Sequence, residues 1–326
     1  MPGTALILGP SGRFARHVAG ALAADGWQLR RFDRRRDRLP EAARGVDLIV
    51  NGWNPPYPRW AAELPGLTAQ VIAAARASGA TVLQPGNVYV FGADAPDRLA
   101  EDTPHRAKNP LGRLRVEMEA RLRDAGIPVI LLRAGDFLDT EASGNWFDAM
   151  IARRVGRGRI AYPGPLDVPH AWAFLPDLAR AAAALAERRA QLARFEDVPF
   201  PGYTLTGAEL AAGLAAALGR PVAARRMAWW PLRLAAPVWP MGRGLLEMRY
   251  LWGKPHRLDG AKLRRLLPDH ADTPLVAALA QSAGSLTSTQ TNRWRDAAAT
   301  ASASGAAGSG QRTPAPVTSS PAEGRT

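Results

Sequence analysis

The first residues that suggest a chemistry lie in a turn close to the N-terminus: Gly9, Ser11, Gly12, Arg13 and Phe14. Gly9 allows the backbone to turn sharply, and Gly12 lets the chain approach a bound group without a side chain in the way. A helix beginning at this turn would direct its unpaired N–H groups and the positive end of its dipole towards that group. These properties suit the pyrophosphate of a dinucleotide.

An acidic residue follows this turn at a distance typical of dinucleotide sites. Asp33 lies 24 residues after Gly9, where a carboxylate can accept hydrogen bonds from the hydroxyls of an adenosine ribose. Arg34 comes next, and an arginine there can instead pair with the 2′-phosphate of NADP. Because Asp33 would repel that phosphate, the sequence favours NAD and leaves NADP open.

Short apolar runs predict the strands that must position these residues. They cover residues 4–8, 27–32, 46–50, 81–84 and 127–132. Helical patterns separate most of them, but only about a dozen residues lie between Asp33 and the third run, which leaves room for no more than an abbreviated crossover. Strands that alternate with helices predict an α/β fold with a doubly wound parallel sheet, a Rossmann fold.

Polar and aromatic residues at the end of the third predicted strand extend the expected cofactor site. In open parallel sheets, ligands bind beyond the carboxyl ends of the strands. Asn51, Gly52 and Trp53 therefore lie on the expected path of the cofactor. Trp53 has a second interpretation, in which its ring only anchors the loop.

With these landmarks the chain resembles the extended short-chain dehydrogenases/reductases of the NAD-dependent epimerase/dehydratase family. The family's glycine turn, its Val-Tyr-Gly strand end, its catalytic helix, its Arg-Pro-Gly strand end and its late Asp-x-Ala motif match residues 9–15, 86–92, 111–115, 133–135 and 174–179. Residues 258–267 and the Thr-Pro-Leu at 273–275 resemble the family's C-terminal helices. The resemblance covers residues 1–282 and implies the Rossmann fold and NAD(P) binding.

The chain departs from the family at the catalytic positions. The serine or threonine that holds the substrate oxygen aligns with Asn87, the catalytic tyrosine with Leu111, and the lysine with Arg115. Leucine cannot transfer a proton, whereas Arg115 can still donate to the hydroxyls of the nicotinamide ribose. Asn87 can orient a reacting oxygen, yet it is no ordinary proton shuttle.

Another group must therefore carry the proton if the chain is an enzyme. Tyr89 lies two residues past Asn87, and histidine at His170 suits general acid/base work near neutral pH. Each also has a structural interpretation: Tyr89 as a core ring with one bonded hydroxyl, and His170 bonded to a backbone carbonyl. Asp136 follows the fifth strand, where it either contacts the substrate or caps the turn.

The segment after the fifth strand is expected to line the substrate cavity, as in extended members of the family. Asn145 and Trp146 are the candidate substrate contacts, and a helix cap and a packing indole are the alternatives. Arginines at 153, 154, 157 and 159 form a basic loop that could bind a phosphate ester, although solvated charge is the simpler interpretation.

The domain organisation follows from these assignments. We expect an NAD(P)-binding Rossmann domain over residues 1–190, with the chain crossing between domains from residue 140, and a smaller substrate-side domain over residues 191–282. Residues 283–326 are rich in Ser, Thr, Ala, Gly and Pro, which predicts a disordered tail.

Composition limits the remaining function classes. The net charge is +13, but only three of the 42 basic residues are lysine and the arginines are dispersed, which favours a solvated surface over nucleic-acid binding. The chain has no cysteine, which excludes disulfides and thiolate sites, and we predict no metal site. With no signal peptide and no apolar run long enough to span a bilayer, a cytoplasmic protein is expected.

A stretch dense in tryptophan and proline, residues 227–241, lies in the C-terminal half. Burial within the smaller domain is its simplest interpretation. The alternatives are an apolar lid, a homodimer surface or an interfacial contact with a membrane.

Two functions remain open. The first is an atypical NAD(P)-dependent epimerase or oxidoreductase acting on a small hydroxyl- or carbonyl-bearing substrate, such as a sugar derivative. The second is a noncatalytic NAD(P)-binding scaffold or sensor, which the loss of the Tyr/Lys pair favours.

Overall fold

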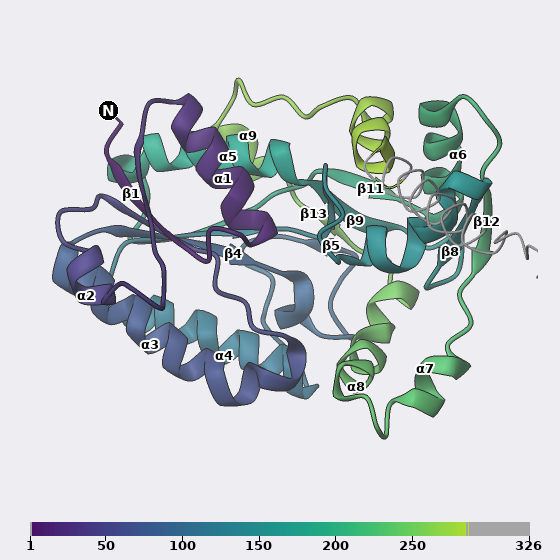
Figure 1. Ribbon diagram of the computed structural model, residues 1–326, viewed down its shortest axis with the longest axis horizontal. Helices are drawn as coiled ribbons and strands as arrows, with labels where there is room; N and C mark the ends of the chain where they lie inside the picture. Colours follow the sequence, from purple (N-terminus) through teal and green to yellow (C-terminus); the bar gives the residue numbers. More distant parts are fainter. Residues whose placement is uncertain (1, 285, 287–326) are drawn as a thin grey trace, which may run out of the picture. The chain divides into compact units, whose positions relative to one another are not determined.

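The computed structural model describes residues 2–284 and 286, and its centre is a six-stranded parallel sheet (Figure 1). The strand order is β10-β6-β4-β3-β1-β2. The strands are β1 (Thr4–Leu8), β2 (Gln28–Arg31), β3 (Leu48–Asn51), β4 (Thr81–Gly86), β6 (Val129–Arg133) and β10 (Phe195–Pro199). The pairing sets Ala5 of β1 opposite Leu29 of β2 on one side and Leu48 of β3 on the other.

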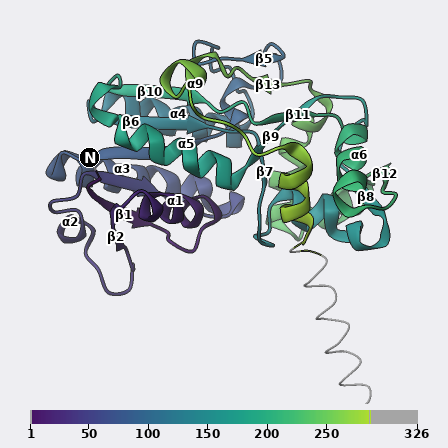
Figure 2. The ribbon, with the colours of Figure 1, turned by 90° about the horizontal axis from the view of Figure 1, so that it is seen from above.

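Helices cover both faces of this sheet, so the predicted doubly wound α/β fold is confirmed (Figures 1 and 2). One face carries α1 (Arg13–Ala24), α5 (Leu175–Glu187) and α9 (Ala261–Leu266), and the other carries α2 (Leu39–Ala42), α3 (Trp60–Ser78) and α4 (Pro110–Asp124). The central strands are buried on both faces, which explains why they are continuous apolar runs rather than alternating ones. The expected abbreviated crossover is present, since only the four-residue α2 separates β2 from β3.

Local sequence signals explain where several helices begin and end. Proline occupies the first turn of α4 and α5, where its missing N–H would have no partner in any case. Helix α3 ends at Gly79, whose φ of 73° is the left-handed conformation that glycine adopts without strain. Helix α6 (Gly207–Leu218) begins with a reciprocal capping box between Thr206 and Glu209.

The chain leaves the main sheet to build a smaller part from short sheets. One sheet has the order β11-β9-β7, and two others are pairs, β12-β8 and β13-β5. Their strands are β5 (Arg98–Leu99), β7 (Asp136–Leu138), β8 (Arg159–Tyr162), β9 (His170–Phe174), β11 (Tyr203–Leu205), β12 (Ala223–Arg226) and β13 (Arg257–Leu258). Helices α7 (Trp230–Ala235) and α8 (Pro240–Glu247) follow β12.

Short 3-10 and π helices lie between these elements. They are η1 (Tyr57–Arg59), η2 (Val88–Phe91), η3 (Phe147–Ile151), η4 (Ala152–Arg157), η5 (Arg189–Gln191) and η6 (Met248–Gly253). Two of them, η1 and η2, follow β3 and β4 directly, at the edge of the sheet where a ligand is expected.

Two expected boundaries need correction. Strand β10 lies after residue 190 but pairs with β6, so the chain returns to the main sheet beyond the expected end of the Rossmann domain. The expected tail begins too early, because Ala283 and Leu286 are buried in the apolar cluster that also contains Leu279. Residues 287–326, the remainder of that tail, lie outside the described residues.

Within residues 2–284 and 286, none of the helices combines the length and the apolar character that crossing a bilayer requires.

Candidate cofactor and substrate site

The glycine turn lies at the point where the strand order reverses. Strand β1 has β2 on one side and β3 on the other, so the crossovers leave it in opposite directions and open a crevice at its carboxyl end. Gly9 has φ 65°, and its carbonyl oxygen accepts from the Gly12 N–H at 2.9 Å. A Cβ on Gly52, at the end of β3, would lie 2.5 Å from the Ala15 Cβ, so only glycine fits this close approach.

The N-terminus of α1 fits a bound phosphate. Gly12 is its N-cap residue, and in the described chain no side chain caps this end and no acid lies in its first turn. Beside it is a cavity of about 300 Å³, lined by Gly9, Ser11, Gly12, Phe32, Arg34, Gly52, Trp53, Asn54, Pro55, Arg59 and Glu63. A cradle of glycines with free helix N–H groups is the arrangement that holds the pyrophosphate of NAD or NADP.

Some of the predicted cofactor residues line this cavity, and others do not. Ser11, Arg34 and Trp53 line the smaller cavity, and the Arg34 guanidinium lies over the Trp53 ring at 4.4 Å. The Asp33 carboxylate turns back onto its own loop, where Oδ1 accepts from the Arg35 N–H at 2.9 Å. The Phe14 side chain is buried in the core beneath α1, so it does not line the cavity in which a cofactor contact was expected.

Asn51 has a structural partner at the end of the next strand. Its Nδ2 donates to Gln84 Oε1 at 2.7 Å, and its Oδ1 accepts from the Trp53 N–H at 3.2 Å. The amide therefore ties β3 to β4 and shapes the loop that carries Trp53.

A larger cavity of about 660 Å³ shares Asn54 and Pro55 with the smaller one. Its wall gathers several predicted site residues from distant parts of the chain: Arg13, Asn87, Tyr89, Arg115, Asp136, Asn145 and Trp146. The α8 region closes another side through Trp239, Met241 and Leu245. This cavity is the candidate substrate site because it adjoins the glycine cradle and combines apolar walls with a few polar groups.

A pair of tyrosine hydroxyls faces this cavity. The hydroxyl oxygens of Tyr57 and Tyr89 lie 2.6 Å apart. Burial raises the pKa of Tyr57 to about 12, while the Tyr89 hydroxyl and the charges of Arg115 and Arg13 act in the lowering direction. Burial and the neighbouring Tyr57 raise the pKa of Tyr89 well above its usual value. Burial therefore keeps both hydroxyls protonated near neutral pH, and either one can donate to the other across this contact.

Arg115 lies beside this pair as a buried cation. Its guanidinium stacks over the Trp60 ring at 3.9 Å, and Nη2 donates to Asn54 Oδ1 at 2.5 Å. Burial lowers the pKa of Arg115, and Glu119, Tyr89 and Tyr57 oppose that shift. Its Nε is buried and has no hydrogen-bond partner among the described residues.

The position of the family's catalytic tyrosine has become structural. The Leu111 side chain is packed in an apolar cluster with Val90, Phe91 and Met248. Its backbone N–H donates to Glu247 Oε1 at 2.6 Å, and the Asn109 side chain donates to the same oxygen. A carboxylate from the end of α8 thus caps the N-terminus of α4, where a negative charge is favourable.

Asn87 acts as the cap of the turn that carries Tyr89. Its Oδ1 accepts from the Tyr89 N–H at 3.0 Å, which fixes the start of η2. The Asn87 carbonyl oxygen accepts from Arg133 Nη1 at 2.7 Å. The predicted role in orienting the substrate oxygen remains a prediction, with this positioning role beside it.

Arg133 anchors that loop from a buried ionic network. Its guanidinium donates to Glu119 Oε2 at 2.8 Å and to Asp197 Oδ2 at 2.6 Å, with His105 Nε2 at 3.7 Å from Glu119. Burial opposes the charge, but the two carboxylates raise the pKa of Arg133. The side-chain ligand atoms of His105, Glu119 and Asp197 lie within 4.8 Å of one another, and Arg133 already supplies the positive charge between them.

The loop after β7 brings the expected substrate contacts to the cavity. Asn145 caps the turn through Oδ1, which accepts from the Asp148 N–H at 3.1 Å, and the Trp146 ring packs against Trp252 at 5.2 Å. Arg13 of α1 donates to the Ser143 carbonyl oxygen at 2.6 Å. The predicted cofactor helix and the predicted substrate loop are therefore directly joined.

Tyr57 and Asn54 belong to the site, although the sequence patterns did not single them out as site residues. Both come just after β3, in an Asn-Pro-Pro-Tyr-Pro run at residues 54–58. The signal available was their place beyond the carboxyl end of a parallel strand, which is the edge where ligands bind. The contact between Tyr57 and Tyr89 was not predicted, because it depends on how two separate strand ends meet.

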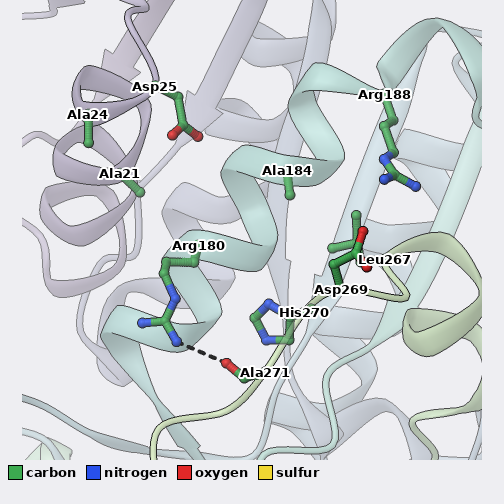
Figure 3. Close-up of a pocket in the computed structure, with 10 residues that line it drawn as sticks. All are labelled: Ala21, Ala24, Asp25, Arg180, Ala184, Arg188, Leu267, Asp269, His270 and Ala271. Carbon is green, nitrogen blue, oxygen red and sulfur yellow. Dashed lines mark hydrogen bonds between the residues drawn. The ribbon is translucent and has the colours of Figure 1, made fainter.

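A third cavity, of about 380 Å³, lies away from the predicted site residues, between α1, α5 and the segment after α9 (Figure 3). Arg180 spans part of it by donating to the Ala271 carbonyl oxygen at 3.0 Å. His270 and Asp269 come from the same segment.

No family model matches the chain, and no curated protein sequence matches it. Solved structures do match. MoeE5 in complex with UDP-glucose and NAD is 16% identical, with a TM-score of 0.68 and coverage of 88% of this chain and 100% of that chain. A nucleoside-diphosphate-sugar epimerase from Pseudomonas aeruginosa is 20% identical, with a TM-score of 0.67 and coverage of 88% and 98%.

UDP-glucuronic acid 4-epimerase from Bacillus cereus, in complex with UDP-glucuronic acid and NAD, is 12% identical, with a TM-score of 0.66 and coverage of 88% and 99%. The resemblance to the extended short-chain dehydrogenases/reductases is thus confirmed at the level of the fold. The chain shares the fold of these structures over 88% of its length.

Proposed function

We propose that this protein is an atypical NAD(P)-dependent oxidoreductase or epimerase that acts on a hydroxyl- or carbonyl-bearing substrate of the nucleotide-sugar type. The observation that carries the proposal is the larger cavity. It adjoins the glycine cradle and collects a hydrogen-bonded pair of tyrosine hydroxyls, a buried arginine and a carboxylate in one wall. The structural neighbours bound to NAD and UDP-sugars support this class of substrate.

The bound nicotinamide would supply or accept the hydride. The chain's own residues would bind and orient. Gly12 and the N–H groups at the start of α1 would hold the pyrophosphate, and Arg115, in the wall of the larger cavity, would hold a ribose hydroxyl. Asp136, at the cavity wall, would accept a hydrogen bond from a substrate hydroxyl.

Tyr57 is the proposed proton donor, supported by Tyr89. Its raised pKa keeps the hydroxyl protonated at neutral pH, so it suits donation to an oxygen that gains negative charge. The Tyr89 hydroxyl would then stabilise the Tyr57 phenolate by donating to it across the 2.6 Å contact. In this arrangement the pair replaces the tyrosine and lysine that the family carries on α4.

The test of this assignment is turnover of a substrate found by screening nucleotide sugars and related carbonyl compounds with NADH and NADPH. Tyr57→Phe should lower kcat by about 100-fold or more, because positioned proton transfer contributes roughly 10²–10⁴-fold. Tyr89→Phe should have a smaller effect, since it removes only the bond to the phenolate. Tyr203→Phe is the matched control, since the Tyr203 hydroxyl donates to the Thr273 carbonyl oxygen.

Cofactor affinity, measured by NADH fluorescence, separates the outcomes. All three tyrosine variants should bind NADH like the wild type. Wild-type turnover in Tyr57→Phe and Tyr89→Phe would remove the proposed proton path. His170 remains the second candidate from the sequence, and it contacts the cavity wall through Asp136.

NAD is the proposed cofactor, with NADP as the alternative. The two choices predict opposite results for two neighbouring variants. If NAD is used, Asp33→Ala should weaken NADH binding, because the loop that Asp33 braces carries Arg34 into the adenosine-side cavity. Tighter binding of NADPH than NADH, lost in Arg34→Ala, would assign NADP instead.

A noncatalytic NAD(P)-binding scaffold is the second candidate function. The observation that favours it is Leu111, whose side chain is packed in the core at the position of the family's catalytic tyrosine. Tight NADH binding together with no turnover of any screened substrate would favour the scaffold.

A further inference from the structure

The exposed apolar side chains of this protein are concentrated in one short segment. Among the described residues, five large apolar side chains are prominently exposed, and four of them lie within residues 230–239. They are Trp230 (65% exposed), Leu234 (72%), Val238 (87%) and Trp239 (42%). They lie in α7 and in its connection to α8, at one edge of the fold (Figure 1). We call this group the α7 surface.

The fold holds these side chains outward. The preceding Trp229 points inward, where its Nε1 donates to the Pro163 carbonyl oxygen at 2.8 Å. Arg243 of α8 donates to the carbonyl oxygens of Ala236 at 3.0 Å and Pro237 at 2.7 Å, which fixes the connection between the two helices. The expected burial of the whole stretch 227–241 is therefore wrong, since Trp229 is buried but Trp230, Leu234 and Val238 are exposed to solvent.

Exposed arginines lie in the same segment of the chain as the α7 surface. Arg225 and Arg226 of β12 and Arg233 of α7 are all exposed. Residues 220–250 contain six arginines and one acidic residue, Glu247. Glu247 is already used in capping α4, because its Oε1 accepts from the Leu111 N–H and from Asn109. Exposed apolar rings and a one-sided excess of arginine thus occur on the same segment.

We propose that the α7 surface docks this protein on an anionic lipid bilayer. Tryptophan prefers the boundary between headgroups and acyl chains, and Leu234 and Val238 supply apolar area that can enter it. The arginines would interact with anionic headgroups, each strengthening binding by roughly fivefold near the surface. The segment docks without spanning the bilayer, since α7 has six residues.

Charge favours a bilayer over a second copy of this chain. A twofold symmetric dimer brings the same patch of both subunits together, so two sets of Arg225, Arg226 and Arg233 would lie at one interface. An anionic surface neutralises them instead. Trp239 also lines the larger cavity with Met241 and Leu245, so docking would hold one wall of that cavity at the bilayer surface.

Flotation of the full-length protein with vesicles tests the proposal. Vesicles of phosphatidylcholine alone are compared with vesicles that also contain phosphatidylglycerol. The protein should float with the anionic vesicles, weakly with the neutral ones, and less as the salt concentration rises. The combined change Trp230→Ser, Leu234→Ser and Val238→Ser should lower the partition coefficient at least tenfold.

A charge variant and two controls complete the experiment. Arg225→Gln with Arg226→Gln and Arg233→Gln should weaken binding to anionic vesicles by about 100-fold, from roughly fivefold for each arginine. Val276→Ser, at an exposed apolar residue elsewhere, and Arg113→Gln, at an exposed arginine of α4, should bind like the wild type. Circular dichroism melting and NADH fluorescence check that every variant is folded with its cofactor site intact, independently of any turnover.

Three results would overturn the proposal. They are absence of flotation with anionic vesicles at low salt, unchanged flotation of the triple serine variant, and equal binding to neutral and anionic vesicles. A dimer in sedimentation velocity that the serine variant abolishes would assign the surface to a second copy and would also overturn it.

Discussion

The Nε2 of His170 lies 2.7 Å from Oδ2 of Asp136, which joins a buried imidazole to a carboxylate at the wall of the larger cavity. The two residues come from the paired strands β9 and β7. The imidazole is stacked on the Trp252 ring, with 4.1 Å between the ring centroids, and this contact fixes its orientation. The Asp136 carboxylate is consequently held in one position relative to a bound substrate.

This pairing predicts the effect of His170→Gln. Hydrogen bonds to charged groups contribute about 1.5–3 kcal/mol, so loss of the imidazole should lower kcat/KM by about 10- to 100-fold. Asp136→Ala should cost at least as much, because it removes the substrate contact itself. NADH affinity should stay at the wild-type value in both. Full activity of His170→Gln would show that the imidazole does not position Asp136.

Gly12→Ala tests the cofactor cradle without breaking the fold. The backbone of Gly12 has φ −70° and ψ 145°, which alanine also adopts, but a Cβ would lie 3.1 Å from the Gly9 carbonyl oxygen. NADH affinity measured by calorimetry should fall at least tenfold, while the melting temperature changes little.

The matched control for that variant is Gly20→Ala, on an exposed part of the same helix with no atom within 4 Å of the new Cβ. It should keep its NADH affinity and gain about 0.5–1 kcal/mol of stability, because glycine is unfavourable inside a helix. Equal NADH affinity in both alanine variants would exclude the glycine turn as the pyrophosphate site.

Arg133→Met should strongly destabilise the fold. Removing the cation leaves Glu119 and Asp197 as buried, uncompensated carboxylates, at a cost of about 3–5 kcal/mol in the free energy of unfolding. Urea unfolding measures this cost. Adding Glu119→Gln and Asp197→Asn should recover much of it, because both uncompensated charges are then gone. A loss below about 1 kcal/mol in the single variant would contradict the network's structural role, since breaking a buried pair is strongly destabilising.

Acid should destabilise the protein through buried neutral histidines. Burial and the charge of His170 lower the pKa of His256 to about 3, and burial and Arg133 lower the pKa of His105 to about 4. The unfolded chain binds these protons near pH 6.5, so stability is present above pH 6.5 and is lost as the pH falls through the folded pKa values.

The slope for each imidazole is about 1.4 kcal/mol per pH unit between pH 6.5 and its folded pKa. Urea unfolding from pH 7 to pH 4.5 measures the total. His256→Gln removes one of the two groups, so its stability should fall less over this range than that of the wild type. An identical pH dependence in both proteins would show that His256 is not the titrating group.

Much of the fold was predictable because its signals are local. The glycine turn after β1, the apolar runs of β3, β4 and β6, and the capping box at Thr206 each depend on residues within a few positions of one another. Strand β10 was not predicted. Its charged pair Glu196-Asp197 does not read as a buried strand, and Asp197 is accommodated only because Arg133 of β6 lies beside it.

The sequence by itself determined the α/β class, the place of the cofactor cradle and the loss of the family's catalytic pair, because turn chemistry, periodicity and residue identity are properties of short segments. Only the tertiary structure brings together the groups that we propose in place of that pair. Tyr57 and Tyr89 are separated by 32 residues, and Asp136 and His170 by 34, and no local pattern links them. Their contacts arise because a parallel sheet brings the carboxyl ends of separate strands, and the loops that follow them, to one edge.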